Sequence, residues 1–394
     1  MWRQLAAAVV VVTAAAAITA GVAAHAAAPA LPNLAYARAQ VARYRAVPRW
    51  TAPGPAIAAR KAAGKRVAVV PLATALPYQQ QLGGGLRAAA KAVGVVLEEQ
   101  PGEGQPAQWA QGVERAIAQR ADLIALIGAP DPLAIQRQLR RGRAAGIPVV
   151  VGNLVNEGTL PFPNVTARMD VVAQSAQRIA VDYEIAYSKG RAKTLIVTSN
   201  DAGASQGLVA SARDEYATVC GPDCTVTVVN VPLAQWSTRL QPAVEAALAA
   251  DSSITIVHPV YDGMTAFAVA GIKDAGAQRR VRIGTVDGSE SVLRMIQQRA
   301  DKGLVLFDVG YSLDWQGWAD LDVILRVLLG LPVPKTQNLP RRIFDATNVN
   351  ATGTPPLSLK GYGDAYRRGY LQLWGVLAPR PGRQPGPRRS TSSL

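Results

Sequence analysis

The sequence predicts an α/β protein whose parallel sheets are covered by helices on both faces. From Arg66 onward, short runs of Val, Ile and Leu alternate with longer helix-like segments. Parallel neighbouring strands need a crossover connection, which the helices supply. A strand buried on both faces has no solvent side, so its apolar run is continuous. With 394 residues and 49% hydrophobic residues, the chain is long enough for two lobes.

The predicted strands are short and the predicted helices lie between them. We expect strands at 67–71, 95–99, 123–127, 148–152, 194–199, 225–230, 254–258, 281–286 and 304–307. We expect helices at 106–120, 131–145, 171–186, 242–250 and 289–299. Ligands of such sheets lie at the carboxyl ends of the strands, so the residues that follow each strand are the candidates for a site.

The N-terminus has the sequence pattern of an export signal. A short basic start is followed by an uncharged run from Leu5 to Ala24 and by Ala-His-Ala, which predicts a signal peptide at 1–26. The alternative is an uncleaved membrane anchor, because the apolar run is just long enough to span a bilayer. Residues 27–65 are expected to form a short basic helix and a Pro, Gly and Ala-rich linker, so that the domain begins at Arg66. Residues 378–394 are expected to be a disordered basic tail.

The net charge of +15 belongs to the ends of the chain. Residues 1–65 carry eight Lys or Arg and no acid, and residues 377–394 carry four Arg and no acid. Subtracting these twelve from 42 leaves 30 basic residues against 27 acidic residues in the body. This distribution does not favour a nucleic-acid partner.

Two cysteines, Cys220 and Cys224, flank a Gly-Pro-Asp turn. In an exported protein such a close pair predicts a disulfide. Only His25 and His258 are present, so the sequence offers too few ligands for a metal site, and no cofactor is expected.

The strand ends resemble those of the type I periplasmic binding proteins, the ribose- and galactose-binding class. The resemblance runs in order from about Arg66 to Val333 and rests on the following segments: Val67-Ala-Val-Val-Pro, Leu76-Pro-Tyr-Gln-Gln-Gln-Leu, Ala121-Asp-Leu-Ile-Ala-Leu-Ile-Gly, Ala145-Gly-Ile-Pro-Val-Val-Val-Gly-Asn, Val260-Tyr-Asp-Gly-Met and Ile283-Gly-Thr-Val-Asp-Gly-Ser. It implies two doubly wound parallel-sheet lobes joined by a three-crossing hinge, with the ligand between them. Lobe 1 would comprise 66–165 and 312–339, and lobe 2 would comprise 166–311 and 340–377.

A sugar pocket needs flat apolar faces and acceptors for hydroxyl protons. By resemblance, Tyr78 would stack on the ligand and Asn153 would bind it, with helix capping as the alternative for Tyr78. Asp287 is the strongest candidate acceptor, although Asp-Gly-Ser-Glu also suits a helix N-cap.

Further candidates follow other strands. Tyr261 and Asp262 are expected at the pocket, and Tyr311 and Trp315 near the third hinge crossing, where one of them would wall the cleft. Leu208 lies where ribose binders carry an arginine, which allows a less hydroxylated or partly apolar ligand.

The resemblance implies a monomeric solute-binding protein that passes a small polar, sugar-like ligand to the permease subunits of an ABC transporter. The alternative is an extracellular sensor of the same fold. An enzyme is not expected, because the nucleophile-elbow and phosphate-loop motifs are absent. A repressor is not expected either, since the chain before Arg66 carries an export signal and no helix-turn-helix.

Overall fold

The computed structural model describes residues 33–75, 77–128, 130–154, 162–171, 173–200 and 204–378, which belong to one compact unit. The expected signal peptide, 1–26, lies outside these residues, as does the expected basic tail beyond residue 378. Among the described helices, none is both long and apolar enough to cross a bilayer.

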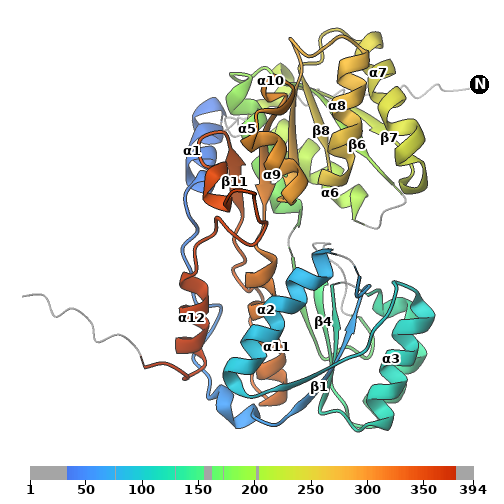
Figure 1. The fold of residues 1–394 in the computed structure, drawn as a ribbon, viewed down its shortest axis with the longest axis vertical. Helices are drawn as coiled ribbons and strands as arrows, with labels where there is room; N and C mark the ends of the chain where they lie inside the picture. Colours follow the sequence, from blue (N-terminus) through green and yellow to red (C-terminus); the bar gives the residue numbers. More distant parts are fainter. Residues whose placement is uncertain are drawn as a thin grey trace, which may run out of the picture. The chain divides into compact units, whose positions relative to one another are not determined.

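The first lobe is built on a five-stranded parallel sheet in the order β2-β1-β3-β4-β5. Its strands are β1 (Arg66–Pro71), β2 (Val96–Glu99), β3 (Leu123–Ile127), β4 (Val149–Leu154) and β5 (Ala167–Asp170). Helices α2 (Pro77–Val93) and α11 (Leu313–Leu328) cover one face, and α3 (Pro106–Ala118) and α4 (Gln136–Ala144) cover the other (Figure 1). Val67 and Val69 pack toward α2 and α11, whereas Ala68 and Val70 pack toward α3 and α4. Burial on both faces thus explains the uninterrupted apolar runs.

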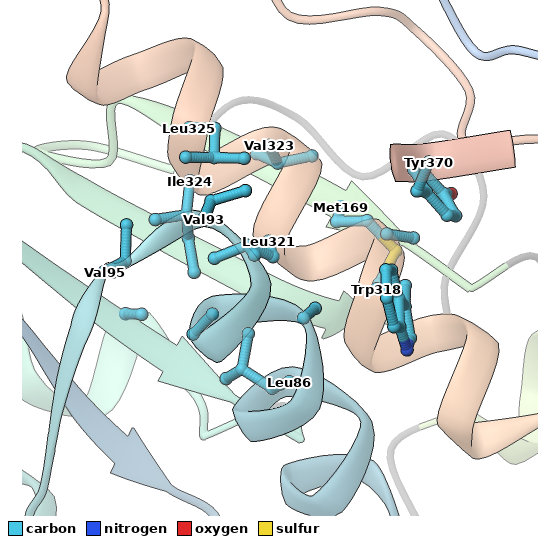
Figure 2. Close-up of a cluster of buried hydrophobic side chains, with 14 of the residues drawn as sticks. Leu86, Val93, Val95, Met169, Trp318, Leu321, Val323, Ile324, Leu325 and Tyr370 are labelled. Atoms are coloured by element: carbon cyan, nitrogen blue, oxygen red, sulfur yellow. The ribbon is translucent and has the colours of Figure 1, made fainter. Parts of the chain in front are cut away.

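Two glycines allow α2 and α11 to approach closely. A Cβ atom at Gly85 would lie 2.4 Å from the carbonyl oxygen of Asp314, and one at Gly317 would lie 2.4 Å from the backbone nitrogen of Leu86. Figure 2 shows Leu86 of α2 in one cluster with Leu321 of α11. A larger residue at either glycine would push the helices apart.

The second lobe is built on a six-stranded sheet in the order β11-β10-β9-β8-β6-β7, parallel except for the antiparallel β11. Its strands are β6 (Lys193–Thr198), β7 (Thr225–Asn230), β8 (Ile256–Pro259), β9 (Arg282–Asp287), β10 (Val305–Gly310) and β11 (Arg342–Asp345). One face packs on α5 (Ala173–Tyr187) and α6 (Ser205–Glu215), and the other on α7 (Gln241–Ala250), α8 (Thr265–Asp274) and α9 (Glu290–Gln297).

The remaining helical segments are short turns and two terminal helices. The short turns are η1 (Ala59–Ala62), η2 (Pro132–Ile135), η3 (Tyr216–Cys220), η4 (Gly221–Asp223), η5 (Leu233–Gln235), η6 (Trp236–Leu240), η7 (Asp262–Met264), α10 (Ala300–Gly303) and η8 (Val349–Thr352). The terminal helices are α1 (Asn33–Arg45) and α12 (Ala365–Leu373).

The chain passes between the lobes at the three predicted crossings, which lie between β5 and α5, between β10 and α11, and between α11 and β11. Two further crossings were not predicted. Helix α1 packs on α5 and β11 of the second lobe, whereas Ile57, Ala59 and Ala62 lie in the core of the first lobe. Near the C-terminus, Tyr362 belongs to the second core and Tyr366 to the first. Five segments therefore connect the lobes.

The structure revises three expected boundaries. Strand β5 pairs with β4, so residues 166–170 belong to lobe 1 and not to lobe 2. Helix α12 packs in the core of lobe 1, although 340–377 was expected in lobe 2. Residues 48–65 are not an external linker, because Ile57 is 7% exposed and lies in that same core. The linker expectation was wrong because a single apolar side chain in Pro and Ala-rich sequence can be buried without forming a helix or strand pattern.

Candidate functional site

The carboxyl ends of three neighbouring strands of the second lobe place an acid and a tyrosine together. Strand β9 ends at Asp287, and Tyr311 follows β10 directly. The Tyr311 hydroxyl donates to Asp287 Oδ1 at 2.5 Å, and the backbone nitrogen of Asp262, after β8, donates to Asp287 Oδ2 at 3.2 Å. Asp287 and Tyr311 are both half-buried. The acid is thus oriented by groups from both adjacent strands.

The backbone turns sharply after β9. Asp287 has φ 136° and Gly288 has φ 78°. A Cβ atom at Gly288 would lie 2.8 Å from the Cα atom of Gly310, so this position requires glycine for close approach as well as for its conformation. The turn directs the chain from the strand into α9.

Asp262 is a buried acid that positions the loops around Asp287. Its Oδ1 accepts from the Thr285 hydroxyl at 3.0 Å, and its Oδ2 accepts from the Ser289 backbone nitrogen at 2.7 Å. Asp308 lies within β10 with no exposed surface, and its Oδ1 accepts from the Gly288 nitrogen at 3.0 Å. Sequence reasoning missed Asp308, although an acid inside an apolar strand was a visible signal.

Burial raises the pKa of all three carboxyl groups, and neighbouring acids raise those of Asp287 and Asp308 further. Burial, followed by the charge of Asp262, raises the pKa of Asp287 to about 8. Burial also raises the pKa of Asp262, and burial with the nearby acids raises that of Asp308 well above its usual range. At neutral pH Asp287 therefore carries a proton in much of the population and can donate as well as accept a hydrogen bond.

Aromatic side chains lie near this acid. Tyr261 is half-buried, its hydroxyl lies 3.1 Å from Ser205 Oγ, and its ring centroid lies 6.5 Å from that of Trp236. The Trp236 indole nitrogen donates to Ser199 Oγ at 3.0 Å. Trp236 follows β7 by only a few residues, but the pattern of strand ends in the sequence did not indicate it.

Tyr78 of the first lobe lies near Asp287 and Tyr311. It lies in the first turn of α2 and is half-buried. Burial raises its pKa, and the charges of Asp320 and Asp287 raise it further, while Tyr78 in turn raises the pKa of Tyr311. Tyr78 is therefore close enough to Asp287 and Tyr311 to interact with them electrostatically.

Two sequence candidates have almost no exposed surface. Asn153 is 0% exposed; its Oδ1 accepts from the Gly128 nitrogen at 2.9 Å, and its Nδ2 donates to Gln316 Oε1 at 3.3 Å. Trp315 is 1% exposed and stacks on Tyr366 with centroids 4.5 Å apart. Both residues support the first lobe, so Tyr311 is the hinge aromatic that lies beside the acid.

A cation from the hinge also reaches the site. The Arg341 guanidinium lies 5.1 Å from the centroid of the Tyr311 ring, a cation–π distance. Leu208, expected where ribose binders carry an arginine, is 2% exposed in α6. Arg341 thus contacts this site from the hinge, although no sequence pattern indicated it.

Residues 67–331 match a family model described as a periplasmic binding protein domain. This chain belongs to the periplasmic binding protein family. Proteins of this family bind solutes and are not enzymes, so the chain is a binding protein. The match excludes α1, residues 46–62 and α12. No curated protein matches the chain.

Solved structures show the same fold. The sugar-binding protein of a sugar ABC transporter from Bacillus halodurans is 16% identical with a TM-score of 0.63, covering 73% of this chain and 99% of that one. A solute-binding protein from Actinobacillus succinogenes 130z with bound D-allose is 16% identical with a TM-score of 0.60, covering 73% and 99%. A 5-methylthioribose transporter protein from Thermotoga lettingae TMO is 17% identical with a TM-score of 0.59, covering 78% and 97%.

The one described histidine of this binding protein is buried and hydrogen-bonded within the second lobe. His258 is 0% exposed, with Nδ1 2.6 Å from Glu184 Oε1 and Nε2 2.7 Å from Gln177 Oε1. Gln177 also donates to the carbonyl of Val260 at 3.1 Å, which fixes the chain just before Tyr261. Within the described ranges, no group of three or more His, Cys, Asp or Glu residues has the arrangement of a metal site.

Cys220 and Cys224 form a disulfide with Cα atoms 5.8 Å apart, as predicted. It closes the loop between η3 and β7, at the edge of the second sheet. The disulfide is therefore separate from the end of β9, which carries Asp287.

Proposed function

We propose that this binding protein holds a sugar or sugar-like polyol between its lobes and delivers it to the permease subunits of an ABC transporter. The observation that carries the proposal is the hydrogen-bonded pair of Asp287 and Tyr311, with Tyr78 of the other lobe within electrostatic reach. A ligand contacting both sides would favour the closed arrangement, because only its differential affinity shifts the equilibrium.

The chemistry of these groups suits neutral hydroxyl compounds. A sugar hydroxyl both donates and accepts hydrogen bonds. The Asp287 carboxyl group, whose pKa is raised to about 8, can accept a hydrogen bond when ionised and donate one when protonated near neutral pH. The faces of Tyr78, Tyr261 and Trp236 offer apolar surface for C–H groups. A charged anionic ligand is less suited, since the carboxylate of Asp262, and that of Asp287 when it is ionised, would repel it.

We assign the binding roles to Tyr78, Tyr261, Asp287 and Tyr311. Asp262 holds the turn that presents Asp287, and both of its oxygens already accept hydrogen bonds. Asn153 and Trp315 have supporting roles. Asn153 holds the turn after β3, and Trp315 packs α11 against Tyr366.

A partly apolar sugar derivative fits the residues best. The buried Leu208 offers no cation at the place where ribose binders carry one. The Arg341 guanidinium lies over the ring of Tyr311. These features favour a ligand with fewer hydroxyl groups to pair.

A melting-temperature screen with D-allose, L-arabinose, allitol and 5-methylthioribose tests the binding, because a ligand of the folded state raises the melting temperature. Titration calorimetry of a positive compound should show roughly tenfold to hundredfold weaker binding by Asp287→Ala, from the loss of one buried hydrogen-bond partner. Asp251→Ala removes an exposed acid of the same lobe and should bind normally.

Equal affinities of Asp287→Ala and the parent would remove Asp287 from the site. No stabilisation by any sugar or polyol would contradict the ligand class. Delivery is tested separately by uptake of the labelled ligand in cells with and without this protein; unchanged uptake would contradict the transport role alone.

A further inference from the structure

A basic pocket lies on the hinge side of the molecule. Its cavity volume is about 590 Å³, and its walls come from the end of α1 and the residues after it, the start of α5, and the crossing that leads to β11. Most of the α1 and crossing segments that line it lie outside the residues matched by the family model. The pocket is therefore built largely from sequence that is additional to the matched domain.

Three arginines line this pocket, and none of its lining residues is acidic. Arg43 and Arg49 are exposed, and Arg341 is 7% exposed. The nearest acid of β11, Asp345, is bound by Arg45, whose Nη2 lies 2.5 Å from Asp345 Oδ2. Arg43 and Arg49 therefore give the wall a positive charge that Asp345 does not neutralise, since Asp345 already has a partner.

The pocket is also preorganised. Arg341 donates through Nη1 to the carbonyl of Pro340 at 3.0 Å and lies over Tyr311, which holds its guanidinium in place. Arg43 lies 5.2 Å from the ring centroid of Tyr44, another lining residue. Ser175 and Asn338 also line the pocket, and Asn338 Nδ2 donates to the carbonyl of Ala52 at 3.4 Å. Donors fixed before binding lose less entropy when a ligand arrives.

We propose that this pocket binds a phosphate group, carried by a small phosphate ester or by a lipid headgroup. Guanidinium groups match the oxygens of phosphate in pairs, and Arg43 and Arg49 bring two such groups to the wall. The cavity is larger than phosphate alone needs, so it accommodates the organic part of an ester. The site differs from the proposed sugar site in charge and in its residues, and Arg341 lies between them, since it lines this pocket and contacts Tyr311.

The test uses inorganic phosphate with the full chain. Equilibrium dialysis at constant ionic strength should show saturable binding of one phosphate per chain. The double variant Arg43→Gln/Arg49→Gln should weaken this binding about tenfold or more, because it removes two charge-assisted donors. Both residues are exposed, so the fold should survive. Arg341 is left intact because it is buried and contacts Tyr311.

The matched control is Arg137→Gln/Arg140→Gln, which removes the same charge from exposed positions of α4 outside the pocket. It should bind phosphate as the parent does. Flotation with phosphatidylglycerol and phosphatidylcholine vesicles distinguishes a lipid headgroup from a small phosphate ester. If the ligand is a lipid, the parent and the control should float with phosphatidylglycerol vesicles, and the pocket variant should not. Equal behaviour of the two double variants in both assays, which is the result for an adventitious ion only, would overturn the proposal.

Discussion

The Tyr311 hydroxyl donates to Asp287 Oδ1 at 2.5 Å; Asp287 ends β9, and Tyr311 directly follows the adjacent parallel strand, β10. One hydrogen bond therefore joins the acid at the centre of the candidate site to the segment that begins a hinge crossing. A movement of the hinge would change the environment of the acid, and ligand at the acid would bias the hinge.

Replacing Tyr311 with Phe should weaken sugar binding about fivefold to tenfold while leaving the fold intact. The substitution removes the hydroxyl that donates to Asp287 Oδ1. The acid is then less well oriented for the ligand, which should weaken the binding free energy by about 1 kcal/mol. Titration calorimetry with the compound found in the screen measures the change.

Tyr187→Phe is the control, because Tyr187 is 47% exposed at the end of α5 and should bind like the parent. If Tyr311→Phe also binds like the parent, the hydroxyl has no role in holding the acid for the ligand.

The stability of the protein should fall as pH rises from about 4 to about 8. Burial and the charge of Asp262 raise the pKa of Asp287 to about 8. In this window the folded chain holds a proton that the unfolded chain has released, since an unfolded Asp titrates near pH 4. Each such proton lowers the free energy of unfolding by up to about 1.4 kcal/mol per pH unit. Asp287→Asn should show a smaller fall, measured by urea unfolding between pH 5 and pH 8.

The comparison needs a carboxyl group that does not titrate in this window. Hydrogen bonds from Ser253 lower the pKa of Asp251, so Asp251→Asn should keep the slope of the parent. The same slope in Asp287→Asn as in the parent would show that Asp287 is ionised throughout.

Most of the fold could be predicted from the sequence, because buried parallel strands have continuous apolar runs. Each of the nine predicted strands overlaps a strand of the structure. The two strands that were missed, β5 and β11, read Ala-Arg-Met-Asp and Arg-Ile-Phe-Asp. Both lie at sheet edges, where polar residues are tolerated, so an apolar-run criterion does not detect them.

The candidate site could be predicted only in part, because a strand end fixes a position but not the direction of a side chain. Asp287 and Tyr311 follow adjacent strands and meet. Asn153 also ends a strand, but with φ 66° its amide is held by Gly128 and Gln316 inside the lobe. Whether such a residue points to the ligand or inward depends on tertiary contacts.

The disulfide should contribute modestly to stability. Cys220 and Cys224 close a very short loop, for which the chain-entropy relation gives about 2 kcal/mol. Cys220→Ser/Cys224→Ser should lower the free energy of unfolding by about this amount in urea, with ligand affinity unchanged. Thiol labelling of the unfolded, unreduced parent should find no free thiol; two labelled cysteines would show that the bond does not form.

The segment between α1 and β1 should be required for the stability of the first lobe. The backbone nitrogen of Ile57 donates to the carbonyl of Leu373 at 2.8 Å, and Arg326 donates to the carbonyl of Pro55 at 2.9 Å. Trp50 packs edge-on against Tyr370 with centroids 5.8 Å apart. A chain that begins at residue 66 loses all of these contacts and exposes the core behind them.

Ile57→Ala isolates this contribution without removing the backbone. The side chain is 7% exposed in the core of the first lobe, so its truncation should lower the free energy of unfolding by about 2 to 4 kcal/mol. Leu133→Ala, at a side chain 57% exposed, should change it by less than about 0.5 kcal/mol. Urea unfolding measures both variants beside the shortened chain. If Ile57→Ala is as stable as Leu133→Ala and the chain from residue 66 unfolds like the parent, residues 46–62 lie against the lobe without stabilising it, and the domain begins at β1.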